Sequence, residues 1–65
     1  MASVLSGKVS EVGEGFIVLG ADIRVIVSSR VRPEGLVQGV NVIVKARLRG
    51  AEWVAEDIQV RHNSR

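Results

Sequence analysis

The sequence has no cysteine and no tyrosine, and it contains only one histidine, one phenylalanine and one tryptophan. Without cysteine, the chain can form neither disulfides nor thiolate metal sites. The single histidine, His62, has no second histidine or cysteine with which to bind a metal, so we expect no metal and no other cofactor. No residues combine as nucleophile, base and orienting acid, and we expect no enzymatic activity.

Long apolar runs are also missing, and none of the stretches could cross a bilayer. The first six residues lack the basic region and apolar core of a signal peptide, so we expect a cytoplasmic location. Sixty-five residues suffice for one domain. We assign residues 1–61 to that domain and expect residues 62–65 to form a disordered tail. Such a short chain has a thin core, which dense β-branched packing, closure of a sheet or oligomerisation would supplement.

The segment Val40–Arg49 alternates apolar and polar residues with a period of two, which is typical of a half-buried β-strand. One face would carry Val40, Val42, Val44, Ala46 and Leu48, and the other Asn41, Ile43, Lys45, Arg47 and Arg49. The second face therefore presents three cations to the outside. Seven of the nine cationic residues in the chain are arginines, whose planar group suits phosphate, although the net charge is only +2.

Five strands are expected in all, which predicts an all-β protein. They span Val4–Val12, Gly15–Leu19, Asp22–Ser28, Val40–Arg49 and Glu52–Val60. The segment between the third and fourth strands contains Pro33 and Gly35, which leave room for one helical turn at most.

Two dipeptides, Gly20-Ala21 and Gly50-Ala51, fit two-residue type II′ hairpins. The first turn would pair Leu19 with Asp22. It would place Phe16, Val18, Ile23 and Val25 in the core and Ile17, Leu19, Arg24 and Ile26 outside.

The second turn would pair Arg49 with Glu52 and Lys45 with Glu56, and would leave Arg47 opposite Val54 without an acidic partner. Trp53 would face inward. The apolar residues at the end of the fifth strand are out of phase with those at its start, and a bulge near Glu56-Asp57 would correct this.

This layout resembles a minimal OB-fold, a five-stranded Greek-key barrel, here with little or no helix between the third and fourth strands. The resemblance extends from about Val4 to Val60. The strings that carry it are Gly7-Lys8-Val9, Ile23-Arg24-Val25-Ile26-Val27, Gly39-Val40-Asn41-Val42-Ile43-Val44 and Ala55-Glu56-Asp57-Ile58-Gln59-Val60.

The resemblance implies a nucleic-acid-binding surface on the second and third strands and on the adjoining loops. It points to single-stranded DNA or RNA, held with little sequence specificity, and to neither a membrane nor a small-molecule substrate. Residues of both the strand surface and the loop before Pro33 are candidates for binding. They are Arg24, Arg30, Arg32, Lys45, Arg47 and Arg49.

The alternative is a protein-interaction or homodimerising barrel, such as an accessory subunit. Four apolar residues would face outward on neighbouring strands and form a patch, and such patches usually mark a partner surface. They are Ile17, Leu19, Ile26 and Ile43. A protein partner or a second copy of the chain would cover them.

Overall fold

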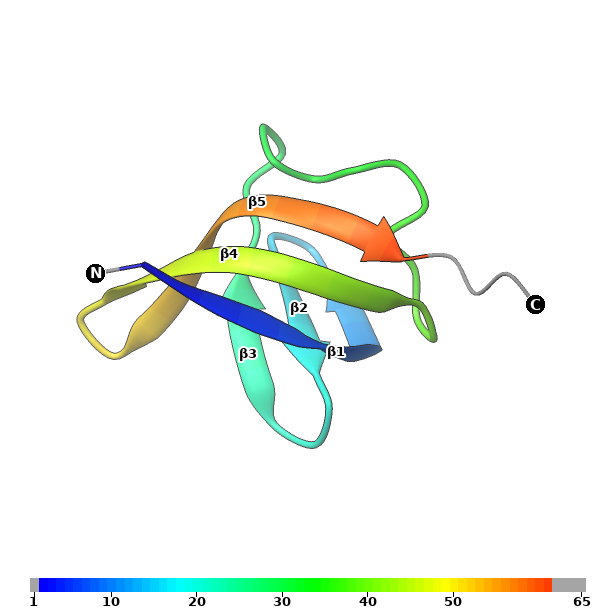
Figure 1. Ribbon diagram of the computed structural model, residues 1–65, viewed down its shortest axis with the longest axis horizontal. Coiled ribbons are helices and arrows are strands. Elements are labelled where there is room, and N and C mark those ends of the chain that lie inside the picture. Colours follow the sequence, from blue (N-terminus) through cyan, green and yellow to red (C-terminus); the bar gives the residue numbers. More distant parts are fainter. Residues whose placement is uncertain (1, 62–65) are drawn as a thin grey trace.

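The computed structural model describes residues 2–61, which form five β-strands and no helix (Figure 1). The strands are β1 (Ala2–Gly13), β2 (Phe16–Leu19), β3 (Ile23–Ile26), β4 (Asn41–Arg49) and β5 (Glu52–Arg61). The expected all-β class is therefore confirmed. No helix in this range could span a membrane. The tail expected at residues 62–65 lies outside the described residues.

The strands close into a barrel in the order β1-β2-β3-β5-β4, and β4 pairs in turn with β1. The long strand β1 takes part in both halves of the barrel. Its residues Ala2–Lys8 pair with β4, whereas Val9–Gly13 pair with β2. The register with β2 shifts around Ser10, between Val9 and Glu11. A bulge of this kind bends a strand, which lets one strand contribute to two sheets.

The barrel is completed by a short parallel contact between β3 and β5. It consists of the pairs Val25–Trp53 and Ile26–Val54. All other strand pairs are antiparallel. Trp53 is partly buried and packs against the core, in line with its expected inward position.

The β2–β3 hairpin differs by one residue from the expected register. Leu19 pairs with Ile23 rather than with Asp22, so the turn comprises residues 20–22. Because side chains alternate along a strand, a shift of one residue in the pairing turns the side chains of β2 to the opposite face while those of β3 keep theirs. The predicted outward positions of Ile17 and Leu19 are therefore wrong, since they are 0% and 1% exposed.

The shift also changes the positions of residues that were predicted to lie in the core. Val25 is buried as expected. Phe16 and Val18 are only partly buried and stand on the outer face of β2, opposite Ile26 and Arg24. Ile23 is 40% exposed at the end of the barrel. The third residue of the turn thus decides which row of β2 forms the core.

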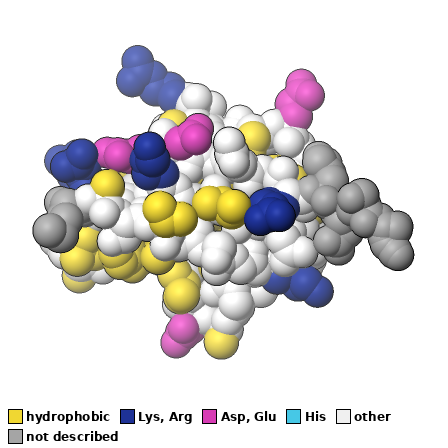
Figure 2. All heavy atoms as spheres, in the orientation of Figure 1, with side chains coloured by type: hydrophobic (Ala, Val, Ile, Leu, Met, Phe, Trp, Pro, Cys, Tyr) yellow, Lys and Arg dark blue, Asp and Glu magenta, His cyan; other side chains and the backbone are white. Residues whose placement is uncertain are grey.

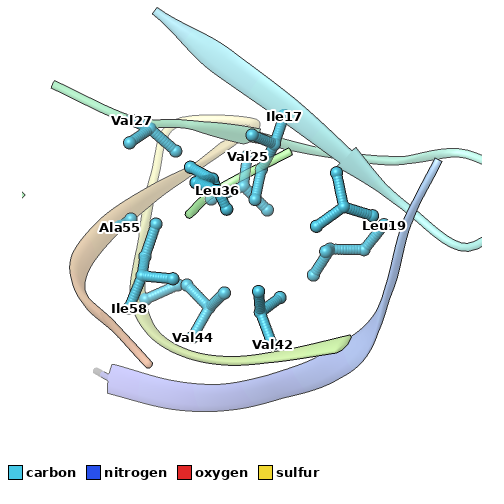
Figure 3. Packing of buried hydrophobic residues seen from close by; sticks show 11 residues of the cluster. Ile17, Leu19, Val25, Val27, Leu36, Val42, Val44, Ala55 and Ile58 are labelled. Carbon is cyan, nitrogen blue, oxygen red and sulfur yellow. The ribbon is translucent and has the colours of Figure 1, made fainter. Parts of the chain in front are cut away.

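Inside the barrel, a single cluster of apolar side chains forms the core. In Figure 3 the labelled side chains converge on the interior of the ring of strands. The members are Val9, Ile17, Leu19, Val25, Val27, Leu36, Val42, Val44, Ala46, Ala55 and Ile58. Most are small or β-branched, which suits a narrow barrel because such side chains pack well on a pleated surface.

The segment between β3 and β4 contains turns but no helix, as expected. It passes above β5 in Figure 1 and returns to the start of β4. Leu36 in this segment is 5% exposed and belongs to the core cluster. This connection therefore supplies a side chain that helps to fill the barrel.

The β4–β5 hairpin has the predicted two-residue turn, with Arg49 paired to Glu52. Gly50 has a φ of +61°, which suits the first central position of a type II′ turn and is disfavoured for other residues. A bulge lies between the pairs Lys45–Asp57 and Ala46–Ala55, which confirms the expected irregularity. Glu56 is the extra residue on β5.

Candidate nucleic-acid interface

The outer row of β4 carries the three predicted cations, Lys45, Arg47 and Arg49, and all three are exposed. The inner row is buried at Val42, Val44 and Ala46, as alternation requires. Leu48 departs from the expectation, since it is 50% exposed near the end of the hairpin. The strand therefore presents its three cations outward, on the face opposite to the buried row.

Each of these cations has an acidic residue close by. Arg49 pairs with Glu52 in the strand register, and Lys45 pairs with Asp57 rather than with Glu56. In Figure 2, cationic and acidic side chains stand side by side over the β4–β5 end of the molecule. Neighbouring carboxylates reduce the positive potential that a polyanion would meet here.

Arg47 has the most direct of these partners. Its Nε donates a hydrogen bond to Glu56 Oε2 at 2.8 Å. The prediction that Arg47 lacks an acidic partner is therefore wrong, because the bulge turns Glu56 toward it. The hydrogen bond from Arg47 lowers the pKa of Glu56; the charges of Arg47 and Lys45 act in the same direction, and desolvation opposes them.

A second cationic site lies on the outer face of β2 and β3. The guanidinium carbon of Arg24 lies 4.5 Å from the centre of the Phe16 ring. Arg24 faces Val18 directly across the two strands, so Phe16 is its diagonal neighbour and within reach of a long side chain. This distance is typical of a cation–π contact.

Gly13 supports the Phe16 ring from the adjacent strand. The two residues pair directly across the β1–β2 hairpin. A Cβ at position 13 would overlap the ring, so the ring occupies space that only glycine leaves free. Phe16 is thereby held against β1 and partly buried, with Arg24 over its ring.

Of the two candidate cations in the loop after β3, one approaches this region. Arg32 Nη1 donates a long hydrogen bond of 3.4 Å to the carbonyl oxygen of Gly13. Arg30 is exposed in the turn that follows β3. The structure therefore brings Arg24 and Arg32 to the same part of the surface. We call the set Phe16, Arg24, Arg32 and Gly13 the Phe16 site.

The Phe16–Arg24 contact was not predicted from the sequence. The predicted register turned Phe16 inward, which removed the one aromatic ring of the second strand from consideration. The signal that could have revealed it is Asp22, a residue that favours turns over strands. Assigning Asp22 to the turn places Phe16 and Arg24 on the same outer face.

The alternative apolar patch does not form. Ile17 and Leu19 belong to the core. Ile26 and Ile43 are partly buried, and they lie on β3 and β4, which β5 separates in the barrel. A protein partner could therefore not bind the four residues as one surface.

The part of the chain that the structure describes contains no group of three or more histidine or acidic residues placed to hold a metal ion. Fold and surface together define a small closed β-barrel with a cation–aromatic pair on its outer face. No protein-family model, curated protein or solved structure matches the chain.

Proposed function

We propose that this protein is a non-enzymatic OB-type module that binds single-stranded DNA or RNA with little sequence specificity. The strand order β1-β2-β3-β5-β4 supports the OB assignment. The shared strand β1 supports it as well, since OB-folds are five-stranded Greek-key barrels. In that class, the outer face of the second and third strands binds oligonucleotides.

The observation that carries the proposal is the position of Arg24 over the Phe16 ring. An aromatic side chain offers a surface on which a base can stack, a contact worth about 1–3 kcal/mol per base. An arginine beside it supplies donors for phosphate and a flat cation that can itself stack. Both residues stand on the outer face of β2 and β3.

The other candidate cations have different parts in this proposal. Arg32 within the Phe16 site and Arg30 next to it in the segment after β3 would contact phosphates. Lys45, Arg47 and Arg49 contribute less, because Asp57, Glu56 and Glu52 are close to them. With a net charge of only +2, binding would be weak at moderate salt.

The test is fluorescence anisotropy with labelled single-stranded DNA and RNA of mixed sequence, at low and at moderate salt. Arg24→Glu should lower the affinity for the oligonucleotide by about tenfold or more, which corresponds to roughly 1.4 kcal/mol. Phe16→Leu should weaken binding without a change in the salt dependence, because it removes stacking and no charge.

Arg47→Glu is the matched control, since it changes the net charge by the same amount on another face. Its effect should be smaller than that of Arg24→Glu. Equal losses would show diffuse attraction without a Phe16 site. No detectable binding at low salt for either polymer would overturn the proposal as a whole.

A further inference from the structure

In the part of the chain that the structure describes, the first half of β1 is paired along only one of its two edges. Ala2–Lys8 pair with β4, while β2 pairs with β1 only from Val9 onward. Within residues 2–61, no backbone hydrogen bond outside the strand ladders reaches Ala2–Gly7. In Figure 1 the dark blue half of β1 runs along β4, the strand with which it pairs.

The hydrogen bonds at the middle of β1 show which residues point toward the open edge. Val9 donates to Val40 and accepts from Gly39, both at 2.8 Å and both on the β4 side. The Lys8 carbonyl instead accepts from Gly20 at 2.9 Å on the other side. Because backbone groups alternate between the two edges of a strand, the N–H and C=O groups of Ala2, Val4 and Ser6 point to the open edge.

This edge lacks the features by which proteins usually prevent strand pairing. Such edges commonly carry charges or proline, and Ala2–Gly7 contains neither. Val4, at its centre, is 67% exposed. By contrast, β5 beyond its short contact with β3 carries Glu56, Asp57 and Arg61.

We infer that this edge binds a second copy of the same chain by antiparallel pairing of β1 with β1. A two-fold axis brings identical surfaces together, so the surface must be self-complementary. The free groups allow one centred register, in which Val4 faces Val4 of the second copy and Ala2 faces Ser6. Each facing pair exchanges two hydrogen bonds.

The charges around this edge are compatible with such a dimer. Lys45 pairs with Val4 on the β4 side. The two copies of Lys45 would be separated by three strand spacings, roughly 14 Å. That exceeds the screening length of about 8 Å at physiological ionic strength. The dimer extends the sheet continuously through β4 and β1 of both copies, and it adds buried surface to a chain with a thin core.

The particle mass of the full chain in sedimentation equilibrium tests the inference. The wild-type protein should have twice the 7.0 kDa mass of the chain. Val4→Lys places two ammonium groups opposite each other, and it should give a folded monomer. Val4→Pro should do the same, because it removes an N–H on the open edge and leaves the bonds to β4 in place.

Val37→Lys is the matched control. Val37 is 55% exposed in the segment between β3 and β4, far along the chain from β1, and the variant should remain a dimer. A monomeric wild-type protein at the concentrations of an NMR sample would overturn the inference. A dimer that persists in Val4→Lys would overturn it as well.

Amide hydrogen exchange supplies a second measurement on the wild-type chain. The amides of Val4 and Ser6 should exchange about tenfold faster, or more, after dilution to the monomer. Those of Leu5 and Gly7 point toward β4 and should stay protected at both concentrations. Fast exchange of Val4 and Ser6 in the concentrated sample would show that the edge is open. If Val4→Pro does not fold, the mass of Val4→Lys and the hydrogen exchange of the wild-type chain still test the inference.

Discussion

Arg47 and Glu56 form an ion pair of 2.8 Å across the β4–β5 hairpin, although regular pairing places Val54 opposite Arg47. The bulge after Ala55 is the cause, because it leaves Glu56 outside the ladder and free to turn toward β4. The same bulge puts Asp57 opposite Lys45. The bulge thus places carboxylates beside Arg47 and Lys45, which leaves Arg24 as the stronger candidate for binding.

The Arg47–Glu56 pair should make stability depend on pH. The hydrogen bond from Arg47 lowers the pKa of Glu56 from its ordinary value of 4.5, so folding favours the charged carboxylate. Its contribution is fully present above pH 4.5 and is lost as the pH falls through the lowered pKa. Urea unfolding at several pH values should therefore show a difference between wild type and Glu56→Gln that shrinks in acid.

The effect will be small because both side chains are largely exposed, at 51% and 38%. Glu34→Gln removes an exposed carboxylate in the segment between β3 and β4 and serves as the control. If the two variants behave alike across the pH range, the ion pair does not contribute to stability.

Glu56→Gln should also strengthen oligonucleotide binding, if the proposed function holds. The substitution frees the Arg47 guanidinium and removes a negative charge beside the β4 row. We expect a few-fold gain in affinity at low salt and a steeper dependence on salt concentration, because one more cation can contact phosphate. Anisotropy titrations measure both. If Glu34→Gln gains as much affinity as Glu56→Gln, the gain comes from the change in net charge alone.

Gly13→Ala should destabilise the protein by about 1–3 kcal/mol, the usual range for overpacking. The added Cβ would overlap the Phe16 ring, which must then move away from β1. Chemical unfolding monitored by the fluorescence of Trp53 measures the loss. Combining it with Phe16→Leu should recover part of the stability. A neutral Gly13→Ala variant would show that the ring does not rest on Gly13.

Ile17→Val and Ile26→Val together test the register of the β2–β3 hairpin. Ile17 is fully buried, and loss of its methyl group should cost about 0.5–1.5 kcal/mol. Ile26 stands on the outer face and is only partly buried, so the same change should cost less. Unfolding free energies of the two variants give the comparison. Similar small losses in the two variants would support the register with a two-residue turn, which places both residues outside.

The period of two in Val40–Arg49 was sufficient to predict β4 and its outward cations. The turn at Gly50 and the bulge near Glu56 also followed from local pattern, because apolar phase and turn chemistry act over a few residues. The register of the β2–β3 hairpin could not be predicted in this way. Gly20-Ala21 and Gly20-Ala21-Asp22 are both plausible turns, and the choice between them exchanges the two faces of β2 relative to β3.

The sequence by itself determined the all-β class, the approximate strands and the outer row of β4, since each depends on alternation or on a glycine turn. Only the tertiary structure decided that Phe16 lies outside beneath Arg24 and that Glu56 reaches Arg47. Among residues 2–61, it also left one edge of Ala2–Gly7 without a partner strand. These features depend on how strands distant in sequence are staggered when the barrel closes, and core packing sets that stagger.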